Sequence, residues 1–117
     1  MKLLIVDDYS ENREILSTAM GLSGHRVDEA YDGIEAIEKL QNDSYDVVIV
    51  DAEMPRMGGV EVCKFIREQL PDVFVIGMSA CFRALKELKD VGTDICLLKP
   101  FHIDVVEEII ENLYCRA

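Results

Sequence analysis

Short apolar runs alternate with amphipathic stretches along the whole chain. Five short segments rich in apolar or β-branched residues predict strands at residues 3–6, 26–30, 46–50, 73–78 and 95–98. Between and after them, apolar positions recur about every 3.6 residues, which predicts helices at residues 10–22, 33–42, 59–69, 81–91 and 103–114. In the last helix, Val106, Ile109 and Leu113 share one face, whereas Glu107 and Glu111 lie on another.

This strict alternation of strand and helix predicts the fold class. The continuous apolar runs at residues 3–6 and 47–50 suit strands that are covered on both faces, whereas the more polar segment 25–30 suits a sheet edge. We therefore expect a three-layer α/β/α fold around a five-stranded parallel sheet of strand order 2-1-3-4-5. Gly24 and Gly92 come just after predicted helices, where a left-handed residue commonly ends a helix.

Length and composition favour one soluble domain over residues 1–117. The chain carries 23 acidic and 12 basic residues, a formal net charge of -11. A surface with this much negative charge repels nucleic-acid phosphates and anionic lipids. We therefore expect neither nucleic acid nor a membrane as a direct partner.

The four cysteines also bear on the setting of the protein. Their spacing is too wide for paired metal ligands, so we expect reduced and mostly buried thiols at Cys63, Cys81, Cys96 and Cys115. The chain opens with a strand-like run rather than a signal peptide. Both features favour a cytoplasmic protein.

Polar functional groups come directly after four of the five predicted strands. Asp7 and Asp8 follow the first strand, Asp51 the third, Ser79 the fourth and Lys99 the fifth. In an open parallel sheet, ligands bind beyond the carboxyl ends of the strands, at the point where the strand order reverses. With order 2-1-3-4-5, that point lies between strands one and three, so the three aspartates are expected to converge there.

Three close carboxylates repel one another, and a divalent cation relieves this repulsion. Oxygen ligands of this kind suit Mg²⁺, and a carboxylate beside it can serve as a nucleophile toward phosphorus. Lys99 and Ser79 would supply a positive charge and a hydroxyl donor. Each residue alone could be a turn or helix-cap residue, but their joint placement after successive strands favours a site.

The residues that follow the strands resemble those of bacterial response-regulator receiver domains, which are flavodoxin-like. The likeness covers essentially the whole chain and is carried by the segments 4–8, 46–59, 76–80 and 97–101, with Tyr31-Asp32-Gly33 at the second helix also similar. The resemblance implies that Asp51 is the phosphoacceptor of a two-component signalling pathway. The donor would be a phosphohistidine on a sensor histidine kinase or a phosphotransfer protein.

The resemblance also assigns the remaining site residues. Ser79 and Lys99 would contact the phosphoryl group, and the Lys99–Pro100 bond would be cis. The ligands of Mg²⁺ (or Mn²⁺) would be Asp7, Asp8, Asp51 and the main-chain carbonyl of Glu53. A downstream protein or effector domain would bind the face made by helix four, strand five and helix five. On this view the chain is a signalling module rather than an enzyme.

Three features depart from the family pattern. Cys96 stands three residues before Lys99, where receivers usually carry an aromatic residue that switches position. The stretch from Ser79 to Gly92 is shorter than usual, so helix four is expected to begin late or to lose part of a turn. Glu53 and Cys81 occupy positions that tune dephosphorylation in the family, and the sequence leaves the direction of the Glu53 effect open.

Two competing hypotheses remain. One is a Mg²⁺-dependent aspartyl-phosphate phosphatase or phosphotransferase of another α/β family. Such enzymes usually carry Asp-x-Asp after the first strand, whereas Asp7 and Asp8 are adjacent. The other is a pseudo-receiver that acts without phosphorylation, against which the intact acidic set argues.

Overall fold

A computed structural model describes residues 1–116 of the chain. At its centre lies a parallel sheet of five strands in the order β2-β1-β3-β4-β5. The strands are β1 (Lys2–Val6), β2 (Arg26–Ala30), β3 (Val47–Asp51), β4 (Phe74–Ser79) and β5 (Ile95–Leu98). The predicted fold class and strand order are thus confirmed.

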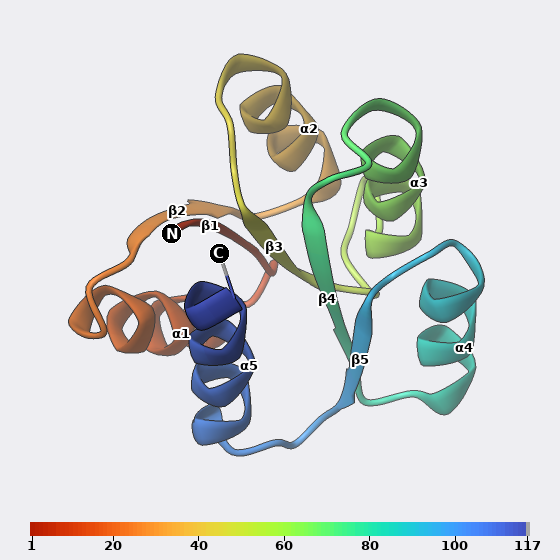
Figure 1. Ribbon diagram of the computed structural model, residues 1–117. Coiled ribbons are helices and arrows are strands. Elements are labelled where there is room, and N and C mark those ends of the chain that lie inside the picture. Colours follow the sequence, from red (N-terminus) through yellow and green to blue (C-terminus); the bar gives the residue numbers. More distant parts are fainter. Residues whose placement is uncertain (117) are drawn as a thin grey trace.

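Helices cover both faces of the sheet. The helices α1 and α5 lie on one face, and α2, α3 and α4 lie on the other (Figure 1). Their bounds are α1 (Ser10–Leu22), α2 (Gly33–Asn42), α3 (Gly59–Gln69), α4 (Phe82–Asp90) and α5 (Ile103–Arg116).

Every predicted strand and helix is present, with ends displaced by no more than two residues. The shifts in β3 and β4 matter for function, because Asp51 and Ser79 are the last strand residues rather than the first residues after the strands. The helix α4 is the shortest of those in residues 1–116, with nine residues, and it begins at Phe82. The left-handed conformation expected after two helices is found at Gly24 (φ 93°) and Gly92 (φ 98°).

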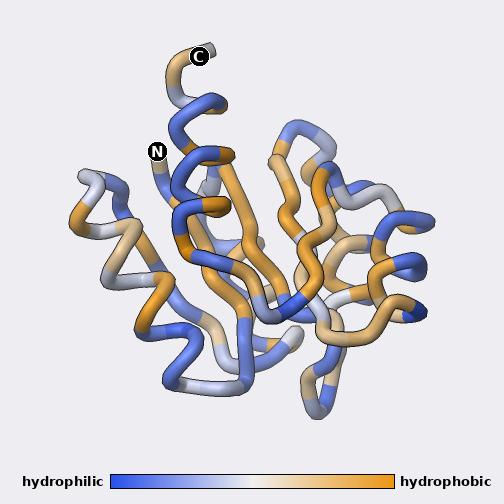
Figure 2. Tube along the Cα trace, turned by 90° about the horizontal axis from the view of Figure 1, so that it is seen from below, coloured by the Kyte–Doolittle hydropathy of each residue, from blue (hydrophilic) through white to orange (hydrophobic). Residues whose placement is uncertain are grey.

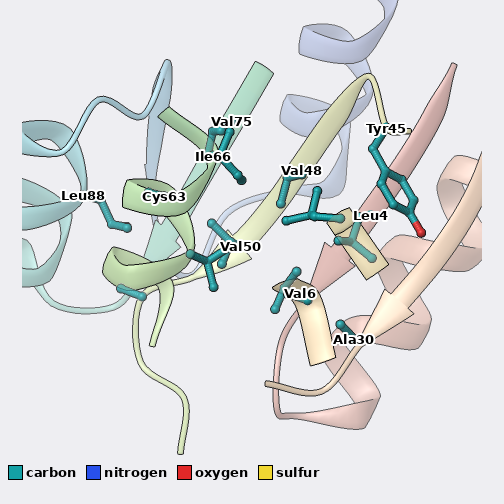
Figure 3. Packing of buried hydrophobic residues seen from close by; sticks show 14 residues of the cluster. Leu4, Val6, Ala30, Tyr45, Val48, Val50, Cys63, Ile66, Val75 and Leu88 are labelled. Carbon is teal, nitrogen blue, oxygen red and sulfur yellow. The ribbon is translucent and has the colours of Figure 1, made fainter. Parts of the chain in front are cut away.

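Alternate residues of the central strands face opposite helical layers, because side chains of a strand alternate between the two faces of a sheet. Leu4 of β1 and Val48 of β3 belong to the same buried cluster as Cys63 and Ile66 of α3 (Figure 3). The neighbouring residues of these strands pack against α1 and α5, at Leu3, Ile5, Val47 and Ile49. Figure 2 shows the apolar strands enclosed by helices of mixed hydropathy. The more polar β2 forms an edge of the sheet, as predicted.

The environments of the cysteines differ from the sequence expectation. The four cysteines are free, but the prediction of mostly buried thiols is wrong: Cys63 is buried, Cys96 is partly buried, and Cys81 and Cys115 are exposed. The exposed pair lies at helix ends, at the N-cap of α4 and in the last turns of α5, where no second layer covers it. Within residues 1–116, every helix is too short or too polar to cross a membrane.

Candidate functional site

The carboxyl ends of β1 and β3 adjoin at the centre of the sheet. Val6 of β1 pairs with Val50 of β3, so Asp7 and Asp51, the next residue of each segment, lie at the same edge. From this edge the chain enters α1 on one face and α3 on the other (Figure 1). Such a divergence opens a crevice between the connections, and this is where open α/β sheets bind ligands.

Three carboxylates gather at this edge. Asp7, Asp8 and Asp51 each offer an oxygen, and these oxygens lie within 4.8 Å of one another. Asp7 and Asp51 are buried, whereas Asp8 is exposed. Hard carboxylate oxygens with one side open to solvent fit Mg²⁺, which takes one or two carboxylates and keeps several waters. The predicted convergence of the acidic residues is confirmed.

Lys99 lies against the same carboxylates. Its Nζ donates to Asp51 Oδ2, and it lies 3.4 Å from Asp7 Oδ2. Burial alone would lower the pKa of the Lys99 ammonium, but the hydrogen bond to Asp51 and the charges of Asp51 and Asp7 outweigh burial and raise the pKa. The ammonium is therefore held in its charged form beside the aspartates.

Asp7 is the most buried of the acidic groups. Burial raises the pKa of its carboxyl group above the ordinary value, an effect that the hydrogen bond from the Tyr9 main chain and the charge of Lys99 only partly offset. The Tyr9 N–H donates to Asp7 Oδ1 at 2.9 Å. Arg13 of α1 donates to the Asp7 main-chain carbonyl at 2.7 Å and pairs with Glu29 of β2 at 3.0 Å. These contacts fix the acidic pair between α1 and the sheet.

The segment after β3 connects Asp51 with Ser79. The Glu53 N–H donates to Asp51 Oδ1 at 2.9 Å, and the Glu53 carboxylate accepts from Ser79 Oγ at 2.8 Å. Ser79 Oγ also accepts from the N–H of Cys81 at 3.0 Å. Ser79 is thus at the predicted edge, but its hydroxyl is bonded to Glu53 rather than to the aspartates.

A close contact with α2 holds the same segment in place. Gly33, the first residue of α2, donates its N–H to the Met57 carbonyl at 3.0 Å. A Cβ atom at Gly33 would lie 2.5 Å from the Met57 carbonyl oxygen, a main-chain atom, so only glycine permits this approach. Asp32 caps α2 by accepting from the Glu35 N–H at 2.8 Å, and its other oxygen lies 3.1 Å from Arg56 Nε.

The structure also shows the surroundings of Cys96 and Cys81, two residues at which the sequence departs from the family pattern. Cys96 is partly buried between β5 and α4, where its sulfur lies 3.1 Å from Thr93 Oγ1 and 3.6 Å from the Leu85 carbonyl. Cys81 is the N-cap residue of α4, and its side chain makes no capping hydrogen bond. The Lys99–Pro100 bond is cis, as the resemblance implied.

A pocket adjoins Asp7 and Lys99 at one side of the site. It has a volume of about 330 Å³, lies between α1 and the start of α5, and is lined by Asp7 and Lys99 together with apolar residues that include Ile15, Met78 and Phe101.

Sequence reasoning missed three of these contacts: the Glu53 side chain on Ser79, Arg13 on the Asp7 carbonyl and Arg56 on Asp32. Each involves a flexible charged side chain that the sequence pattern places on a solvated surface. The Tyr31-Asp32-Gly33 segment was the only available signal for the contact with Arg56.

Comparisons with known proteins bear on the family. The chain matches the response regulator receiver domain model over residues 3–111. It is 35% identical over 116 residues to the sensor protein EvgS of Escherichia coli strain K12, covering 97% of this chain and 10% of EvgS. It is 33% identical over 115 residues to the response regulator MprA of Mycobacterium avium, covering 97% of this chain and 49% of MprA. The chain therefore spans between a tenth and a half of the length of these curated relatives.

Solved structures agree with this match. The receiver domain of the Francisella response regulator 1452 superposes with a TM-score of 0.89 and 32% identity, covering 98% of this chain and 97% of that one. The response regulator TrrA of Thermotoga maritima, in complex with Mg²⁺–BeF, superposes with a TM-score of 0.87 and 33% identity, covering 96% and 97%. The chain belongs to the response regulator receiver domain family and has a phosphoacceptor role in signalling.

Proposed function

We propose that Asp51 accepts a phosphoryl group from a phosphohistidine in a Mg²⁺-dependent reaction and that this changes a protein-interaction surface. The observation that carries the proposal is the position of Asp51. Its carboxylate lies against the Lys99 ammonium and shares a cluster of oxygens, within 4.8 Å of one another, with Asp7 and Asp8. Family membership supports this role over that of a phosphatase of another α/β family.

The ligands that would hold Mg²⁺, or Mn²⁺, are Asp7, Asp8, Asp51 and the main-chain carbonyl of Glu53. The acidic cluster supports this assignment, and TrrA, a relative of similar structure, binds Mg²⁺–BeF. When bound, the metal supplies positive charge beside the carboxylates and the phosphoryl oxygens.

In the proposed transfer, a carboxylate oxygen of Asp51 forms a bond to phosphorus. The P–N bond of the phosphohistidine breaks, and the leaving imidazole nitrogen keeps the electron pair. Lys99 pairs with Asp51 Oδ2 before transfer, so its ammonium is already in place to neutralise charge on the phosphoryl oxygens. The Ser79 hydroxyl then donates a hydrogen bond to one of these oxygens.

The proposed partners are a sensor histidine kinase or phosphotransfer protein as donor, and a downstream protein or effector domain. The sensor protein EvgS is among the relatives, which supports a kinase pathway. For the downstream partner we favour the face of α4, β5 and α5. Each of these elements carries a large exposed apolar side chain: Phe82, Leu98 and Val105.

We further propose that residues 1–117 form a single receiver domain that acts in the cytoplasm. One sheet with helices on both faces accounts for residues 1–116, and the family match covers residues 3–111. The net charge of -11 supports a protein partner over nucleic acid or a membrane surface. The chain would act as a signalling module that assists only its own phosphorylation and dephosphorylation.

Incubation with a small phosphodonor such as acetyl phosphate, followed by mass spectrometry of the intact protein, tests the proposal. We expect the mass gain of one phosphoryl group with Mg²⁺, and none with EDTA or in Asp51→Asn. An equal gain in Asp51→Asn would show that another residue is the acceptor. No gain in the wild type with Mg²⁺ would favour the pseudo-receiver hypothesis.

A further inference from the structure

The hydroxyl of Ser79 has only one proton, and the structure shows where that proton goes. Ser79 is buried, with 1% exposure, and its Oγ lies 2.8 Å from Glu53 Oε1. The second contact of this oxygen is an acceptor contact, from the Cys81 N–H. Because a carboxylate only accepts and a serine hydroxyl donates once, the proton is committed to Glu53 and is not free for another acceptor.

Glu53 makes hydrogen bonds with both Asp51, the proposed phosphoacceptor, and Ser79, the proposed donor to the phosphoryl group. Its main-chain N–H donates to Asp51 Oδ1, and its side chain accepts from Ser79. The carboxylate that holds Ser79 therefore belongs to a residue whose backbone is fixed against the proposed phosphoacceptor. An anionic group on Asp51 would need the same hydroxyl proton.

We propose that Glu53 competes with the phosphoryl group for the hydroxyl proton of Ser79. This inference rests on the proposed function, because it takes Asp51 as the acceptor and Ser79 as the donor to the phosphoryl group. In the unphosphorylated chain the Glu53 carboxylate occupies the donor. Phosphorylation of Asp51 breaks the Glu53–Ser79 hydrogen bond, and the Ser79 hydroxyl donates to a phosphoryl oxygen instead.

The charge of Glu53 fixes the direction of its effect. A carboxylate cannot donate a hydrogen bond to a phosphoryl oxygen, and like charges at close range repel one another. Glu53 therefore opposes an anion on Asp51 in two ways, by holding Ser79 and by its own charge. The sequence left this direction open, and the geometry points to a weaker hold on the anion.

The Ser79 hydroxyl oxygen also takes part in a second hydrogen bond, at the start of α4. Ser79 Oγ accepts from the N–H of Cys81, which is the N-cap residue of α4. A change of partner at the Ser79 hydroxyl therefore acts directly on the segment that begins α4. Glu53 thus helps to set how readily the α4 end of the molecule responds to phosphorylation.

Binding of fluoroberyllate, measured by ¹⁹F NMR at saturating Mg²⁺, tests the proposal in the whole chain. Glu53→Ala removes both the acceptor and the charge, and we expect its affinity to rise about three- to tenfold, the change that one net hydrogen bond gives. Glu53→Gln keeps an acceptor oxygen and should bind with intermediate affinity. Glu68→Ala removes one exposed charge from the far end of α3 and should bind as the wild type does.

A Ser79→Ala background separates competition from simple repulsion. In that background, Glu53→Ala should raise the affinity for fluoroberyllate only by the smaller factor that removal of the Glu53 charge gives. Unchanged or weaker binding by Glu53→Ala, or the same gain in both backgrounds, would overturn the proposal. If the wild type and Asp51→Asn bind fluoroberyllate equally, the proposed function itself fails. If the wild type binds it more tightly than Asp51→Asn but Glu53→Ala has the affinity of the wild type, only the competition by Glu53 fails.

Discussion

Asp7 costs the protein stability when no cation is bound. Its side chain is fully buried, and burial is the main reason that the pKa of its carboxyl group is raised. A carboxyl group with a raised pKa in the folded state favours its protonated form there, so folding at neutral pH is opposed by its ionised form. A site built to hold a cation thus carries a charge that the fold alone does not stabilise fully.

Asp7→Asn should therefore stabilise the protein in EDTA. We expect the free energy of unfolding at pH 7 to rise on the order of 1 kcal/mol, because a buried and incompletely paired charge is removed while the acceptor for the Tyr9 N–H is kept. The gain should shrink as the pH falls through the raised pKa and vanish below the unfolded value of 3.8, where the aspartate is protonated in both states. Urea unfolding at pH 7 and near pH 4 measures this difference.

Added Mg²⁺ provides the control for this prediction. It should stabilise the wild type by about 2.7 kcal/mol at a hundred times its dissociation constant and stabilise Asp7→Asn far less. A gain in EDTA that is as large at pH 4 as at pH 7 would contradict the assignment of the cost to the Asp7 charge.

The sequence alone was sufficient to predict which residues gather at the carboxyl ends of the strands. It was insufficient to predict the hydrogen bonds among them. Asp7, Asp51 and Lys99 meet because parallel strands bring their carboxyl ends to one edge. The hydrogen bond from Ser79 to Glu53 depends on the path of the chain after β3, which periodicity does not specify.

At the scale of elements, the segment between β3 and α3 is positioned by α2. Arg56 of this segment adopts a left-handed conformation, with φ of 68°, and pairs with the buried Asp32. A non-glycine residue in this region costs energy, so the surrounding contacts must hold it there. The cap of α2 and the shape of the segment that carries Glu53 are therefore coupled through Asp32.

Substitution of Asp32 should separate the two roles of this residue. Asp32→Ala loses the cap of α2 and should lower the free energy of unfolding by about 1 to 2 kcal/mol. Asp32→Asn keeps a cap oxygen and should lose less, since Arg56 is largely exposed and its ion pair is screened. Urea unfolding measures both, with Asp72→Ala as an exposed control. Equal losses in the Ala and Asn variants would show that the cap contributes nothing.

The elements themselves were predictable because local periodicity and burial agree in this fold. The run Val47–Val50 is apolar throughout, and all of β3 is buried. The strand ends were less predictable: Asp51 and Ser79 are polar, but both still pair with a neighbouring strand. The thiols were misjudged because composition ranks cysteine as a buried residue, whereas Cys81 stands at a helix end.

At the scale of the whole molecule, electrostatic interactions act over longer distances than direct contacts do. The net charge is -11, and the molecule measures 31 × 30 × 25 Å. The Debye length is about 30 Å at 0.01 M salt and about 8 Å at 0.15 M. At low salt, therefore, every acidic group on the chain attracts a cation at the site, whereas at 0.15 M only the nearest groups do.

The affinity for a divalent cation should thus fall as salt is added. We expect the dissociation constant of Mn²⁺, used as a probe and followed by the EPR signal of the free ion, to rise about three- to tenfold between 0.01 M and 0.15 M NaCl. Removal of two exposed charges from α5, in Glu108→Gln with Glu111→Gln, should weaken binding at 0.01 M and leave it unchanged at 0.15 M. If the double variant weakened binding equally at both salt concentrations, α5 would be acting through structure rather than through long-range charge. If salt had no effect on the wild type, the affinity would come from the local carboxylates alone, and the acidity of the remaining surface would play no part in cation binding.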